Sequence, residues 1–147
     1  ICNIGDIVER LKKGGKTVLV HIDLIGGLSS REVAVDFLKN TTEADGVIST
    51  KPGIIKQARE LGLFAVMRFF VIDSIAFESI RRQTESVHPD MIEVLPGVMP
   101  KIIAKICTHS RTPVIAGGLI ADKEDIVAAL SAGAVSISTT NQKVWFM

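Results

Sequence analysis

The chain has 147 residues, 47% of them hydrophobic, so it is long enough for one domain with a buried core and too short for two typical domains. Seventeen Lys and Arg against sixteen Asp and Glu give a formal net charge of +1, which excludes a general attraction to nucleic acid or to an anionic membrane and requires a local patch for either partner. Cys2 and Cys107 belong to no C-x-x-C motif, so we expect both thiols to be reduced. No apolar run approaches the ~20 residues of a membrane span, and the first residues lack the basic and then apolar order of a signal peptide. We therefore expect a cytoplasmic protein with no membrane contact.

Short segments rich in β-branched residues alternate along the chain with amphipathic segments. The strand-like segments are 17–25, 45–50, 64–72, 90–95, 112–118 and 134–139. Their almost continuous apolar character is typical of strands that a parallel sheet buries on both faces. Apolar stripes with helical spacing precede the first of these segments and follow each of the first five, so the sequence predicts an alternating α/β order.

Start and stop signals mark these helices. A capping box spans Ser29 to Glu32, and Pro52 stands where a first helical residue is expected. Asp73 or the residue after it is predicted to cap the fourth helix. Asp122, with Asp125 three residues on, is predicted to cap the last helix.

The strand spacing suits βα units repeated around a barrel or along an open sheet. A complete eight-stranded barrel usually needs ~200 residues or more, and this chain supplies six strands with a further strand end expected at residues 1–4. We therefore expect a TIM-type (β/α)8 barrel with its N-terminal βα unit missing, so that residues 1–147 form a single barrel domain that is incomplete at the N-terminus.

Polar residues collect where the strands end, which is where parallel βα folds bind ligands. They are His21 and Asp23, then Ser49, Thr50 and Lys51, then Arg68 and Asp73, then Glu93 with Pro96 and Gly97, then Gly117 and Gly118, and finally Ser138, Thr139 and Thr140.

Most of these residues have a structural interpretation as well as a functional one. His21 is either a hydrogen-bonded core histidine or an acid or base, and Lys51 either a solvated loop charge or an anion ligand. Arg68 and Glu93 are costly to bury alone, so they pair with each other, contact a ligand, or do both. For Asp23 a role in the site is favoured, because it lies too far from the next helix to cap it.

The ends of the last two strands predict a phosphate site. Gly117 and Gly118 let the backbone come close to phosphate oxygens, and Ser138, Thr139 and Thr140 can donate hydroxyl hydrogen bonds. In (β/α)8 barrels the last two βα loops often bind phosphate in this way. The structural alternative is a tight turn that requires positive φ, followed by ordinary helix caps.

The strand-end segments, taken together, resemble the glycerol uptake operon antiterminator family. They are HIDLIGGLSS, ADGVISTK, RFFVIDS, PDMIEVLPG, PVIAGGLI and GAVSIST followed by VW, in order from about Gly15 to Trp145. The resemblance implies a bacterial cytoplasmic regulator with a (β/α)8 barrel. Such a regulator responds to glycerol 3-phosphate and binds the leader of a glycerol operon messenger RNA, which prevents a transcription terminator from forming.

The resemblance also assigns ligand-binding residues. It implies that small and hydroxylated residues hold the phosphate, that two cations add positive charge, and that a carboxylate accepts hydrogen bonds from the glycerol hydroxyls. These groups are Gly117, Gly118, Ser138, Thr139 and Thr140, then Lys51 and Arg68, then Asp23 or Glu93. No catalytic residue, cofactor or metal site is expected.

The sequence leaves other functions open. The second candidate is a TIM-barrel enzyme that acts on a small phosphorylated metabolite. It would use Lys51 as a Schiff-base or electrophilic lysine and Glu93 or Asp23 as the base. The third candidate is a paralogue that binds phosphate without regulating anything. A homo-oligomer is compatible with the sequence. The sequence does not assign the RNA surface. It contains two basic clusters, and each is either a phosphate contact or a solvated face. The first cluster is Arg10, Lys12, Lys13 and Lys16, and the second is Lys101, Lys105 and Arg111.

Overall fold

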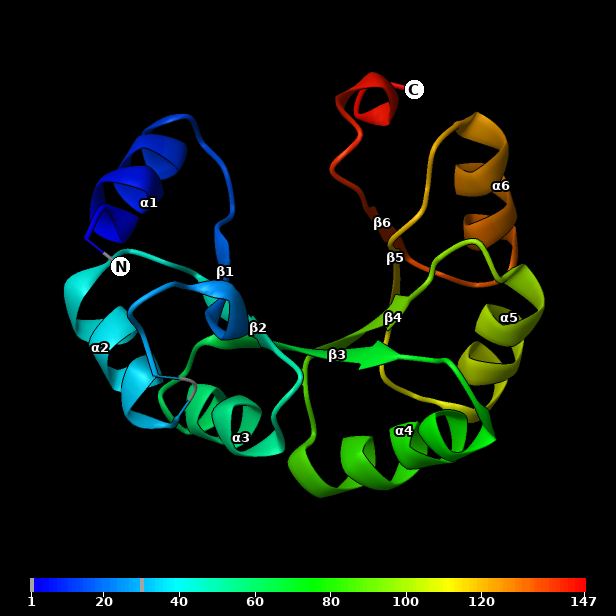
Figure 1. Cartoon of the computed structure of the whole chain (residues 1–147), viewed down its shortest axis with the longest axis horizontal. Helices are drawn as coiled ribbons and strands as arrows, with labels where there is room; N and C mark the ends of the chain where they lie inside the picture. The colour runs from blue at the N-terminus through cyan, green and yellow to red at the C-terminus, as the bar shows by residue number, and fades with distance from the viewer. Residues whose placement is uncertain (1, 30) are drawn as a thin grey trace. The chain divides into compact units, whose positions relative to one another are not determined.

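A computed structural model describes residues 2–29 and 31–147 (Figure 1). The chain divides into two compact units, Ile1–Met67 and Arg68–Met147. The strand β3 (Phe64–Phe70) runs across the boundary between the two units. No helix among these described residues is both long enough and apolar enough to cross a bilayer.

The first unit alternates helices and parallel strands (Figure 1). Its elements are α1 (Ile4–Lys13), β1 (Leu19–His21), the 3-10 helix η1 (Ile22–Leu24), α2 (Val33–Thr41), β2 (Gly46–Ser49), α3 (Pro52–Glu60) and the start of β3. The strand β2 pairs in parallel with both neighbours, so that Gly46 lies opposite Leu19 on one side and Phe64 on the other. A Cβ atom at Gly46 would clash with the carbonyl oxygen of Phe64, and therefore only glycine fits at this first residue of β2.

The second unit repeats the same alternation. Its elements are the end of β3, then α4 (Ser74–Val87), β4 (Met91–Leu95), α5 (Pro100–His109), β5 (Val114–Gly117), α6 (Lys123–Ser131), β6 (Ser136–Ser138) and the 3-10 helix η2 (Gln142–Val144). The strand β5 is parallel to β4 and to β6, with Ile115 opposite Glu93 and Ser136. Apolar side chains of β4, α5 and β5 such as Ile92, Ile103 and Val114 are buried in its core.

The helix signals in the sequence are largely confirmed. Pro52 is at the start of α3, and the Asp73 carboxylate accepts a hydrogen bond from the Ala76 backbone N–H at 2.7 Å. Asp122 likewise accepts from the N–H of Asp125 at 3.0 Å, and the Asp125 carboxylate accepts in return from the N–H of Ala121 at 2.9 Å. Both helices therefore begin where side-chain oxygens replace the missing backbone acceptors.

Three expectations about the first unit are wrong in detail. The strand expected at 17–25 ends at His21, because the chain turns into η1, where the Asp23 side chain accepts hydrogen bonds from the end of β2. The strand end expected at 1–4 is wrong for Ile4, which begins α1 because it opens that helix's apolar stripe, while Ile1 lies outside the described residues.

The capping box expected at 29–32 is the third. The helix α2 begins at Val33 with Glu32 at its N-cap, and the Glu32 side chain makes no capping hydrogen bond among the described residues. The backbone N–H of Arg31 donates instead to the carbonyl of Ser29 at 2.9 Å, so a turn precedes the helix. Residue 30, inside the expected box, lies outside the described part of the chain.

The α/β class is confirmed, since six strands alternate with helices and every described strand pairing is parallel. The finer expectations stay predictions: an eight-unit barrel, a missing N-terminal βα unit, and a single domain over residues 1–147.

Candidate ligand-binding site

In the first unit, Asp23 is the centre of a hydrogen-bonded cluster at the carboxyl end of β2. Its carboxylate accepts from the Ser49 hydroxyl at 2.9 Å, from the Thr50 backbone N–H at 2.7 Å and from the Thr50 hydroxyl at 3.0 Å. Burial favours the neutral carboxyl group, but these three donors outweigh that effect and lower the pKa of Asp23 below its ordinary value. Asp23 is thus an ionised side chain that fastens η1 to the end of β2.

The residues beside this cluster were also singled out by sequence. The ring Nε2 of His21 lies 3.7 Å from Oδ2 of Asp23, and both side chains are largely buried. The backbone N–H of Lys51 donates to the Ser49 hydroxyl at 3.0 Å, and the residue itself is exposed at the N-cap of α3. One end of this unit therefore holds an imidazole, a carboxylate, hydroxyls and an ammonium group.

Because the pKa of Asp23 is lowered by folding, its contribution to stability depends on pH. The contribution is fully present above the unfolded-state pKa of about 3.9 and is lost as the pH falls through the lower folded-state pKa. Asp23→Asn is expected to lower the free energy of unfolding by about 1–3 kcal/mol at neutral pH, because asparagine cannot accept from all three donors. The difference from wild type should shrink below about pH 4, as measured by urea unfolding across pH.

A matched control for this prediction is Asp6→Asn, at an exposed aspartate in the first turn of α1. Its effect is expected to stay within about 0.5 kcal/mol at every pH. A difference between wild type and Asp23→Asn that does not change with pH would contradict the assigned role of the Asp23 charge.

In the second unit, Arg68 and Glu93 form a buried ion pair. Nε of Arg68 donates to Oε2 of Glu93 at 2.6 Å, and the side chains are 15% and 2% exposed. The structural interpretation from the sequence, that these two charges pair with each other, is confirmed. A ligand contact by either residue stays a prediction.

The two adjacent glycines have different local surroundings. Gly118 has a φ of +77°, in the left-handed region that favours glycine, and its carbonyl accepts from the N–H of Gly97 at 3.0 Å. Gly117 ends β5, and a Cβ atom there would lie 2.7 Å from Oε1 of Glu93. The structure thus supports the tight turn at Gly118, whereas the glycine at 117 leaves space for a carboxylate.

After β6, Thr139 links two successive loops. Its hydroxyl donates to the carbonyl of Ile120 at 3.1 Å and accepts from the N–H of Asn141 at 3.1 Å. Its carbonyl accepts from the indole N–H of Trp145 at 3.0 Å. Ser138 is half-buried and Thr140 is exposed. The hydroxyl of Thr139 therefore has a structural use, and a phosphate contact by any of these hydroxyls stays a prediction.

Two residues in the segment after β6, Asn141 and Trp145, were not predicted to be functional. Asn141 donates through its side-chain amide to the carbonyl of Ala121 at 2.9 Å, and Trp145 donates to Thr139. The Asn141 bond ties the segment after β6 to the loop that follows β5, whereas the Trp145 bond lies within the segment after β6. A tryptophan and an asparagine shortly after a strand end were the only sequence signal, and neither residue type by itself indicates this contact.

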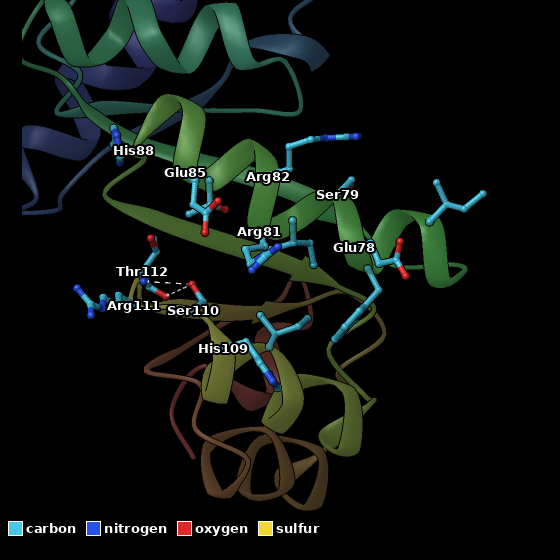
Figure 2. Close-up of a pocket in the computed structure, with 15 residues that line it drawn as sticks. Glu78, Ser79, Arg81, Arg82, Glu85, His88, His109, Ser110, Arg111 and Thr112 are labelled. Carbon is cyan, nitrogen blue, oxygen red and sulfur yellow. Dashed lines mark hydrogen bonds between the residues drawn. The ribbon is translucent and has the colours of Figure 1, made fainter.

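A cavity of about 1070 Å³ lies elsewhere in the second unit, between α4 and the end of α5. Figure 2 shows Arg81 and Glu85 of α4 on the side that faces Ser110 and Thr112. Ser110 and Thr112 precede β5, whereas Gly117 ends it, so the cavity opens at the opposite end of that strand from the predicted phosphate loops. None of the predicted ligand-binding residues lines it.

Comparison with known proteins gives these residues a context. A family model described as glycerol-3-phosphate responsive antiterminator matches residues 1–145. The chain belongs to this family. It is 48% identical over 145 residues to YgcP of Escherichia coli (strain K12), a protein described as uncharacterised, and the match covers 99% of this chain and 76% of YgcP.

Solved structures of antiterminators agree with this assignment. A glycerol uptake operon antiterminator regulatory protein from Listeria monocytogenes is 36% identical with a TM-score of 0.95, and the match covers 99% of this chain and 78% of that one. An antiterminator-related protein from Thermotoga maritima is 38% identical with a TM-score of 0.89, covering 99% and 83%. The resemblance seen in the strand-end segments is confirmed.

More distant structures show the fold alone. An orotidine 5'-phosphate decarboxylase from Pyrococcus horikoshii is 23% identical with a TM-score of 0.66, and the match covers 90% of this antiterminator-family chain and 68% of the decarboxylase. The α/β fold of the family is therefore shared with enzymes, and the fold does not by itself decide between a regulator and an enzyme.

Proposed function

We propose that this protein is a non-enzymatic regulator that binds glycerol 3-phosphate and, in that state, binds the leader RNA of a glycerol operon and prevents transcription termination. The observation that carries the proposal is the match of residues 1–145 to a family described by its response to glycerol 3-phosphate. An antiterminator prevents the end of transcription, and binding to the RNA transcript is a way to do so. A protein that binds such a transcript would work in the cytoplasm. A homo-oligomer stays a compatible expectation.

The chemistry at the strand ends supports an anionic, hydroxylated ligand. In the second unit, Gly118 follows β5 in a left-handed turn, and Glu93 on the neighbouring strand β4 is paired with Arg68. Ser138 ends β6, and Thr140 follows two residues later. Backbone N–H groups in such turns, hydroxyls and a guanidinium are donors that suit phosphate oxygens. We therefore keep these residues as the proposed phosphate contacts.

The deciding experiment is filter binding of the purified protein to the leader RNA, with and without glycerol 3-phosphate. The proposal predicts that RNA affinity rises with the metabolite and that the metabolite is recovered unchanged. Turnover of glycerol 3-phosphate would favour the enzyme alternative, and binding without any effect on RNA would favour a phosphate-binding paralogue with another role.

Lys51→Ala is expected to weaken glycerol 3-phosphate binding by about tenfold, a loss typical of one charge-assisted contact. The side chain is exposed at the start of α3, so the free energy of unfolding should change by no more than about 0.5 kcal/mol. Isothermal titration calorimetry and urea unfolding measure the two effects. Lys56→Ala, at an exposed lysine of α3, is the matched control. A parallel loss of stability and affinity in Lys51→Ala would indicate a structural lysine.

For the RNA contact we favour the cluster of Lys101, Lys105 and Arg111. All three are exposed, whereas in the other cluster Lys12 is paired with Asp45 at 2.6 Å and Lys13 with Glu9, which offsets part of the charge. An exposed basic patch is the form of charge that RNA phosphates meet.

The variant Lys101→Glu/Lys105→Glu is expected to lower RNA affinity at least about tenfold and to reduce its salt dependence, since each phosphate contact contributes to the salt slope. Glycerol 3-phosphate binding should stay unchanged. Filter binding at several salt concentrations makes the measurement, with Lys39→Glu on α2 as an exposed control. Unchanged RNA affinity in the double variant would exclude this patch.

A further inference from the structure

Three residues on three successive strands of the second unit meet around one carboxylate. Glu93, in the middle of β4, is 1% exposed, and its Oε2 accepts from Nε of Arg68 on β3 at 2.6 Å. Its other oxygen faces β5: a Cβ atom built on Gly117 would lie 2.7 Å from Oε1 and 3.3 Å from Cδ of Glu93. The Glu93 side chain thus fills the space between the guanidinium and the backbone of Gly117.

This contact explains why residue 117 is glycine. Real Cβ atoms essentially never come closer than 3.0 Å to another heavy atom, so any larger residue at 117 would displace the carboxylate of Glu93. The displaced carboxylate would lose its short bond to Arg68, and the Glu93 charge, whose side chain is 2% exposed, would be left without that partner. Gly117 lies in a strand, so the cause is space, whereas at Gly118 the cause is its φ of +77°.

We propose that Glu93 is a positioning residue that fixes the guanidinium of Arg68 for an anionic ligand, and that Gly117 is small in order to admit Glu93 rather than the ligand. Arg68, whose side chain is 15% exposed, then meets the phosphate, and the buried Glu93 acts through it. A charge-assisted bond holds a guanidinium in one orientation, which preserves the geometry that a phosphate needs. The identity of the ligand rests on the proposed function, and the contact between Glu93 and Gly117 does not.

The test is a double-mutant cycle of Gly117→Ala and Glu93→Asp. Aspartate is one methylene shorter, so it withdraws the carboxylate from residue 117 and weakens its hold on Arg68. Affinities for glycerol 3-phosphate and for inorganic phosphate are measured by calorimetry at a temperature where circular dichroism shows each variant fully folded. Under that condition a loss of stability alone leaves both dissociation constants unchanged.

The expected result is non-additive. Gly117→Ala in the wild-type background should weaken both ligands at least about tenfold, and in the Glu93→Asp background it should add less than about threefold. Gly118→Ala is the matched control, because its Cβ would contact Leu95, and its effect should be the same in both backgrounds. An equal loss from Gly117→Ala in both backgrounds would overturn the proposal and indicate that the ligand itself approaches Gly117.

The cycle also works if a single variant fails to fold. Recovery of soluble, folded protein in Gly117→Ala/Glu93→Asp would support the contact, and failure of the double variant as well would overturn it. A wild-type protein that binds neither ligand would refute the proposed function and the positioning role of Glu93. The coupling between residues 93 and 117 in urea unfolding would still decide whether Gly117 is small to admit Glu93.

Discussion

Gly118→Val is expected to abolish detectable binding of glycerol 3-phosphate while the protein still folds. The residue has a φ of +77°, and a β-branched side chain at this backbone conformation is strained by about 1–2 kcal/mol. Its Cβ would also lie 3.2 Å from a methyl carbon of Leu95 and would cover the backbone that the phosphate is proposed to approach. A thermal-shift titration measures both the lower starting stability and the lost stabilisation by ligand.

Gly62→Val separates backbone strain from lost binding. Gly62 follows α3 with a φ of +69°, and a Cβ atom there would meet nothing within 4 Å. It should therefore lose a similar amount of stability and keep its full response to glycerol 3-phosphate. A normal ligand response in Gly118→Val would show that the phosphate does not use this turn.

Arg68→Met is expected to lower the free energy of unfolding by about 3–5 kcal/mol, the largest stability effect predicted for this protein. Methionine keeps much of the apolar stem of the side chain and removes the guanidinium. Glu93, whose side chain is 2% exposed, then lacks the partner that donates to its carboxylate at 2.6 Å. Urea unfolding at neutral pH measures the effect.

The double variant Arg68→Met/Glu93→Gln tests the cause of that loss. Removing both charges should recover a large part of the stability, because the penalty comes from leaving one buried charge alone. Arg10→Met on α1 is the exposed control, with an expected change within about 0.5 kcal/mol. If the double variant is as unstable as Arg68→Met, lost packing of the arginine stem is the cause instead.

The sequence predicted well wherever a feature depends on residues close together in the chain. The alternation of apolar strands with amphipathic helices, the cap at Asp73 and the cap at Asp122 are set by local patterns, and the structure confirms them. The clearest failure came where a contact between distant residues overrides the local pattern. The apolar run 17–25 has the composition of one long strand, but it turns at Ile22 because the Asp23 side chain bonds to residues far along the chain.

The candidate site was predicted as a set of residue types and not as a set of contacts. Strand ends in a parallel sheet meet at one edge, so the sequence by itself determined which polar residues lie at the carboxyl ends of the strands. It also determined the family, because several short motifs occur in the right order.

Only the tertiary structure decided what each of these residues touches. Asp23 holds the end of β2, Thr139 bonds to Ile120, and Glu93 lies against Gly117. The partners are separated by about 20 or more positions in the chain, and their approach depends on strand register and side-chain direction. Periodicity along the chain does not specify the distances between atoms of neighbouring strands. Differences of a few tenths of an ångström in those distances decide whether a carboxylate fits beside a backbone.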